Sequence, residues 1–78
     1  MEVCMSREEV LSEVRGIIAR KRRIQVNQIP ERLRLTRGAA NDVAVVLISR
    51  GFKVTLPREQ GLIPLERFVD GISVRVET

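Results

Sequence analysis

A run of apolar residues at helical spacing, opened by a helix cap, is the feature that most constrains the fold of this chain. Ser6 and Glu9 stand three residues apart and predict a capping box, in which each side chain bonds the other residue's backbone N–H. The apolar residues that follow recur at three- and four-residue intervals: Val10, Leu11, Val14, Ile17 and Ile18. We therefore expect a helix over about 7–22 with one face packed against other elements.

The next segment is expected to hold two short elements. Residues 24–26 alternate between apolar and polar side chains and predict a short strand. Asn27 is a suitable N-cap, and Pro30 is compatible with the first turn of a helix over about 28–33.

A third helix is expected over about 37–50. Thr36 is its predicted N-cap, and Gly51 follows as the residue that ends it. Four small or aliphatic residues would form its buried stripe: Ala40, Val43, Ala44 and Leu47.

The C-terminal third predicts two strands, over 52–56 and 72–76, that pair antiparallel across the connection 57–71. A turn of helix is expected within that connection, around Leu65–Val69. With 78 residues the chain has room for one domain, 1–78. The expected fold class is α+β, in the order helix, strand, helix, helix, strand, strand, with a small antiparallel sheet.

The charge is positive and unevenly placed. Residues 1–53 hold eleven basic and six acidic side chains, a difference of +5, and residues 54–78 hold three and four, a difference of −1. A basic domain attracts polyanions such as nucleic acid. Phe52 and Phe68 are its only aromatic residues, which argues against a stacking platform for single strands.

The chemistry of catalysis is poorly represented. The chain has no His, so the usual proton-transfer group at neutral pH is missing, and the sequence contains no Gly-rich phosphate loop with Lys. Cys4 is the single cysteine, which excludes an internal disulfide and a Cys/His zinc site. We expect a non-enzymatic protein with no metal or cofactor, in a reducing, cytoplasmic setting.

The order of elements and the segment 29–52, IPERLRLTRGAANDVAVVLISRGF, carry a resemblance. The segment resembles the helix-turn-helix stretch of bacterial and archaeal winged-helix regulators, placed here at about 28–51. The resemblance implies a winged-helix fold that binds duplex DNA, as a small transcriptional or chromatin-associated regulator and possible homodimer.

The third helix would then face the DNA with its N-terminal turns. Thr36 and the N–H groups after it could hold a phosphate, and Arg37 and Asn41 could read base edges. Other cations would contact the backbone or an adjacent groove: Lys21, Arg22, Arg23, Arg34 and Arg58.

Two other interpretations remain open. Val45 and Val46, if exposed, favour a winged-helix domain that binds proteins, as a homodimer or a subunit of a complex. The segment from Phe52 to Val69 is similar to the last half of acyl-carrier-like helical proteins. Against the carrier, Arg37-Gly38-Ala39 stands near the place where an attachment serine is needed, and carriers are acidic.

Overall fold

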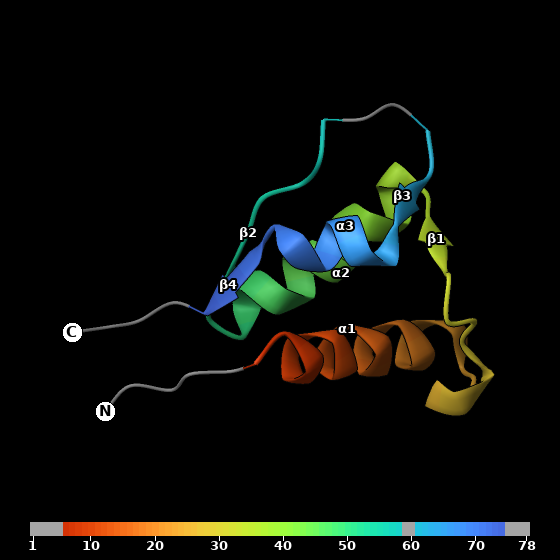
Figure 1. Ribbon diagram of the computed structural model, residues 1–78. Helices are drawn as coiled ribbons and strands as arrows, with labels where there is room; N and C mark the ends of the chain where they lie inside the picture. The colour runs from red at the N-terminus through yellow and green to blue at the C-terminus, as the bar shows by residue number, and fades with distance from the viewer. Residues whose placement is uncertain (1–5, 59–60, 75–78) are drawn as a thin grey trace.

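In the computed structural model, which describes residues 6–58 and 61–74, α1 spans Arg7–Arg22 and begins at the predicted capping box (Figure 1). The Ser6 hydroxyl accepts from the Glu9 backbone N–H, and the Glu9 carboxylate accepts from the Ser6 N–H. At the other end Arg23 is left-handed, with φ of 55°, which ends the helix. The predicted first helix is confirmed.

Between the two long helices the predicted order is wrong. The structure has neither the strand expected over 24–26 nor the helix expected over 28–33. It has a 3₁₀ helix, η1 (Val26–Gln28), and a strand, β1 (Arg34–Leu35). The expected helix-turn-helix at 28–51 therefore lacks its first α-helix.

Proline chemistry explains this correction. Ile29 is extended, with φ of −79° and ψ of 126°, because the ring of Pro30 disfavours the helical conformation in the residue before it. Arg15 on α1 stabilises this extended segment. Its guanidinium donates to the carbonyl oxygens of Ile29 at 3.0 Å and Val26 at 3.4 Å.

The second long helix, α2 (Arg37–Ser49), matches the third predicted helix to within one residue. The Thr36 hydroxyl accepts from the Ala39 backbone N–H at 3.1 Å, so the predicted N-cap is confirmed. Gly51 follows the C-cap with φ of 94°, a backbone conformation that costs glycine little.

Two sheets of two strands each complete the fold. β2 (Phe52–Val54) pairs antiparallel with β4 (Ile72–Val74), as predicted, although β2 is shorter than the expected 52–56. β1 pairs antiparallel with β3 (Ile63–Pro64), a pairing that the sequence did not suggest. Residues 75 and 76 of the last predicted strand, and Cys4, lie outside the described residues.

The expected turn of helix inside the connection is α3 (Leu65–Asp70). The protein is therefore α+β as predicted, but its order is α1, η1, β1, α2, β2, β3, α3, β4. α3 follows β3 directly, and β3 is the element of the connection that the prediction lacked.

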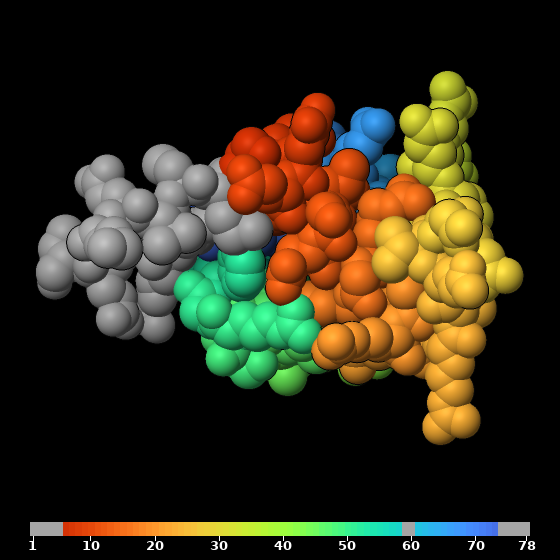
Figure 2. Space-filling model, turned by 90° about the horizontal axis from the view of Figure 1, so that it is seen from below, coloured from red at the N-terminus to blue at the C-terminus, as the bar shows by residue number. Residues whose placement is uncertain are grey.

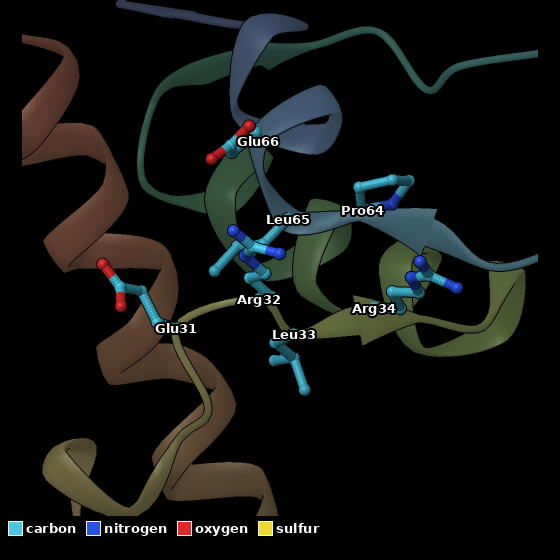
Figure 3. Close-up of a pocket in the computed structure, with 7 residues that line it drawn as sticks. All are labelled: Glu31, Arg32, Leu33, Arg34, Pro64, Leu65 and Glu66. Atoms are coloured by element: carbon cyan, nitrogen blue, oxygen red, sulfur yellow. The ribbon is translucent and has the colours of Figure 1, made fainter.

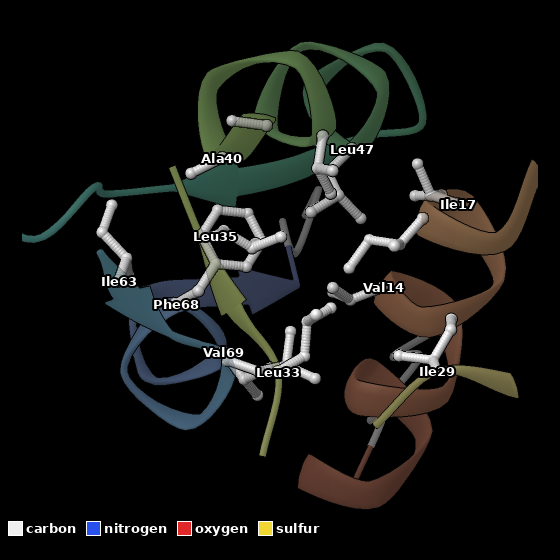
Figure 4. Close-up of a cluster of buried hydrophobic side chains, with 14 of the residues drawn as sticks. Val14, Ile17, Ile29, Leu33, Leu35, Ala40, Leu47, Ile63, Phe68 and Val69 are labelled. Carbon is white, nitrogen blue, oxygen red and sulfur yellow. The ribbon is translucent and has the colours of Figure 1, made fainter. Parts of the chain in front are cut away.

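The core lies where the three α-helices and β1 meet (Figure 4). Its largest fully buried side chains come from five elements: Val14, Leu35, Val43, Leu47, Ile63 and Phe68. No polar or charged residue is buried in the described part of the chain. Arg7 at the start of α1 pairs with Asp70 at the end of α3 and donates to the Glu66 carbonyl oxygen, which fastens α3 to α1.

Within residues 6–58 and 61–74, no helix is both long and apolar enough to cross a membrane.

Candidate nucleic-acid interface

The outer face of α2 is the centre of the candidate site. The predicted buried stripe is confirmed, since Ala40, Val43, Ala44 and Leu47 are all buried. Arg37 and Asn41, which were expected to face the ligand, are exposed, and so are Gly38 and Asp42 beside them. The N-terminal half of this face is thus polar, whereas its C-terminal half carries exposed Val45 and Ile48.

Arg37 contacts the segment that carries Arg58. The Arg37 Nη1 atom donates to the Pro57 carbonyl oxygen at 3.1 Å, which places the connection after β2 beside the first turn of the helix. Arg58 is the next residue in the chain and is exposed. Thr36 is exposed too, but its hydroxyl oxygen already accepts the capping bond from Ala39.

On the other side, α1 packs antiparallel to α2. Glu13, near the middle of α1, pairs with Arg50, just beyond the end of α2, at 2.6 Å between Oε1 and Nη1. Lys21 and Arg22, at the end of α1, share a hollow of about 140 Å³ with Ala39 and Asp42 near the start of α2. Lys21 and Arg22, which were predicted to contact the DNA backbone, therefore lie beside α2, the helix predicted to contact the bases.

A second hollow lies further along the same two helices. Two apolar residues, Ile17 and Val46, and three cations line a volume of about 270 Å³; the cations are Arg20, Lys21 and Arg50. We call this the seam hollow. Figure 2 views the molecule from the side of α1. The C-terminal half of α1 lies there beside the green-to-teal end of α2. Val46 is half-buried here and belongs to the packing between helices, whereas Val45 is 59% exposed.

Arg23 and Arg34, the other two cations predicted to contact DNA, lie at the edges of the site. Arg23 is exposed at the left-handed end of α1. Arg34 is exposed on β1 and lines a hollow of about 280 Å³ (Figure 3). Arg32 and two carboxylates, Glu31 and Glu66, also line that hollow, so the cations there lie beside opposite charges.

Most of the cations around α2 are available to a ligand. Within the described residues, eight basic side chains make no hydrogen bond or ion pair with the protein: Arg20, Lys21, Arg22, Arg23, Arg32, Arg34, Lys53 and Arg58. Four of them are consecutive at the end of α1. The acidic residues Glu8, Glu9 and Glu13 lie in the opposite half of that helix, so α1 is strongly polarised along its length.

The sequence did not predict that Glu13, Arg20 and Arg50 lie close together. Arg20 belongs to the basic run that was recognised, but nothing in the sequence placed it opposite Arg50. The Glu13–Arg50 pair joins residues 37 positions apart. Only the antiparallel packing of α1 on α2 brings these groups together.

Comparisons of the chain with models of known protein families, with curated proteins and with solved structures found no match.

Proposed function

We propose that this protein is a winged-helix-like domain that binds duplex DNA, with α2 in the major groove. The observation that carries the proposal is the position of α2 between two groups of cations. Arg37 and Arg58 lie on one side, and Lys21 and Arg22 lie on the other. A helix in the major groove has a phosphate strand on each side, so this arrangement suits a duplex.

The exposed face of α2 suits the same role. The first turns of a reading helix contact base edges, and here those turns present Arg37 and Asn41. Gly38 is small and exposed, so the helix backbone can approach the bases closely there. β2, β4 and the connection between them would take the place of the wing, with Arg58 reaching a phosphate. η1 and the extended chain after it would take the place of the second helix of a winged helix.

Fluorescence anisotropy on a duplex of about 30 base pairs tests the proposal. Affinity should fall steeply with salt, because each phosphate contact releases about 0.9 counterions. Asn41→Ala should weaken binding to a selected site more than binding to random duplex. Arg67→Gln removes one charge from α3, outside the proposed interface, and serves as the control. Absence of binding at low salt would overturn the proposal.

A second candidate function rests on the C-terminal half of α2. Val45 and Ile48 are 59% and 56% exposed and lie three residues apart, hence on one face. This pair favours a protein-binding domain, with a second copy of the chain as its partner. Sedimentation of the wild type and of Val45→Lys tests it: a dimer that the substitution disperses supports the protein-binding function. A monomer at all concentrations refutes self-association through this face.

A further inference from the structure

We propose that the seam hollow is a phosphate site, which holds a backbone phosphodiester of the bound duplex between Arg20, Lys21 and Arg50. These three cations line it together with two apolar residues, Ile17 and Val46. Its volume of about 270 Å³ admits a phosphate group together with water. The inference rests on the proposed function and adds a site on α2 that the sequence did not indicate.

The position of the hollow fits one strand of a duplex whose other strand lies on the side of Arg37 and Arg58. Consecutive residues of an α-helix project about 100° apart, so Val46, nine positions after Arg37, projects about 180° away from it. The seam hollow and Arg37 therefore lie on opposite flanks of α2. These are the flanks that the two phosphate strands of a major groove occupy when a helix lies between them.

The charges of the hollow are only partly neutralised by the protein. Arg20 and Lys21 have no hydrogen-bond or ion-pair partner within the described residues, whereas Arg50 pairs with Glu13. The side chains of that pair are 38% and 37% exposed, so water and salt weaken the attraction between them. A phosphate that enters the hollow would compete with the Glu13 carboxylate for the Arg50 guanidinium, which bonds phosphate oxygens readily.

This competition gives the two partners of one ion pair opposite effects on anion binding. Arg50→Gln removes a phosphate ligand and should weaken binding. Glu13→Gln removes the competitor and should strengthen it. Each effect should be about fivefold in affinity for inorganic phosphate, as expected for one unit charge at contact distance in water. If the ion pair had only a structural role, both substitutions would change the affinity for inorganic phosphate in the same direction.

The first measurement is a titration with inorganic phosphate at constant ionic strength, followed by amide chemical shifts. Shifts should concentrate at the seam hollow, weaken in Arg20→Gln and Arg50→Gln, and strengthen in Glu13→Gln. Glu8→Gln makes the same change of charge in the first turn of α1 and should have no effect. Because a misfolded variant does not gain affinity, the strengthening in Glu13→Gln separates binding from folding. Equal effects of Glu13→Gln and Arg50→Gln would overturn the inference.

The second measurement is the salt dependence of duplex binding. The double variant Arg20→Gln/Arg50→Gln should lower the slope of log affinity against log salt by about 0.9, because the two cations share one phosphate contact. If the wild type binds duplex and the slope is unchanged, the seam inference fails and the proposed function stands. If the wild type binds no duplex at low salt, the proposed function itself fails.

Discussion

Thr55 and Gly71 lie in direct backbone contact at the end of the β2–β4 pair. The Thr55 N–H donates to the Gly71 carbonyl oxygen at 2.8 Å, and a Cβ atom built on Gly71 would overlap the Thr55 carbonyl oxygen. Only a residue without a side chain fits there. The requirement is steric, because Gly71 has φ of −87°, which any residue adopts.

Gly71→Ala should therefore destabilise the fold by about 1–3 kcal/mol, the usual cost of forcing an extra group into a packed site. Chemical denaturation measures this cost. Gly16→Ala is the control, since a Cβ atom there meets nothing within 4 Å and a helix interior favours alanine. A Gly71→Ala variant as stable as the wild type would show that the two backbones separate freely.

A matched pair of leucines tests the corrected path of the chain through β1. Leu35 is 1% exposed on β1, whereas Leu62 is 53% exposed before β3. Leu35→Ala should cost about 2–5 kcal/mol through the cavity it leaves. Leu62→Ala should change the free energy of unfolding by less than about 0.5 kcal/mol. Similar losses for both variants in urea titrations would contradict the placement of β1 in the core.

The N-cap of α2 should contribute to stability through one hydroxyl group. Thr36→Ala leaves the Ala39 N–H without its side-chain acceptor and should cost about 1 kcal/mol. For a domain of this size that loss lowers the melting temperature by about 4–8 °C. Thr36→Ser keeps the hydroxyl group and should retain most of the stability, which calorimetry on the two variants would show.

The cations at the end of α1 should act on every duplex alike. Lys21→Gln/Arg22→Gln should lower affinity for selected and random duplex by the same factor and reduce the salt slope by about 2, because phosphate contacts carry no sequence information. Anisotropy at several salt concentrations gives both quantities. An unchanged slope would remove these two residues from the interface.

The elements that sequence reasoning predicted well are those whose signals are local. The capping box at Ser6 and the N-cap at Thr36 each fixed the start of a long helix to within a residue. Gly51 marked the end of the second. The outward position of Asn41 followed from helical periodicity once those ends were set.

The elements that were missed depend on contacts between distant residues. β1 exists because Arg34–Leu35 pairs with Ile63–Pro64, and a two-residue strand carries no periodicity of its own. The prediction of a helix over 28–33 relied on Pro30 as a first-turn residue. It neglected the effect of Pro30 on Ile29, the residue before it. The seam hollow also depends on contacts between distant residues, because Glu13 and Arg50 meet only through the packing of α1 on α2.

The two sheets interleave along the chain, since β1 pairs with β3 and β2 with β4. Neither sheet can close as a simple local hairpin, and each closes a loop that contains a strand of the other. A fragment that ends before β3 would leave both β1 and β2 without partners. Folding is thus expected to be all-or-none, and slower than in a helical bundle of the same length, because long loops must close before either pairing forms.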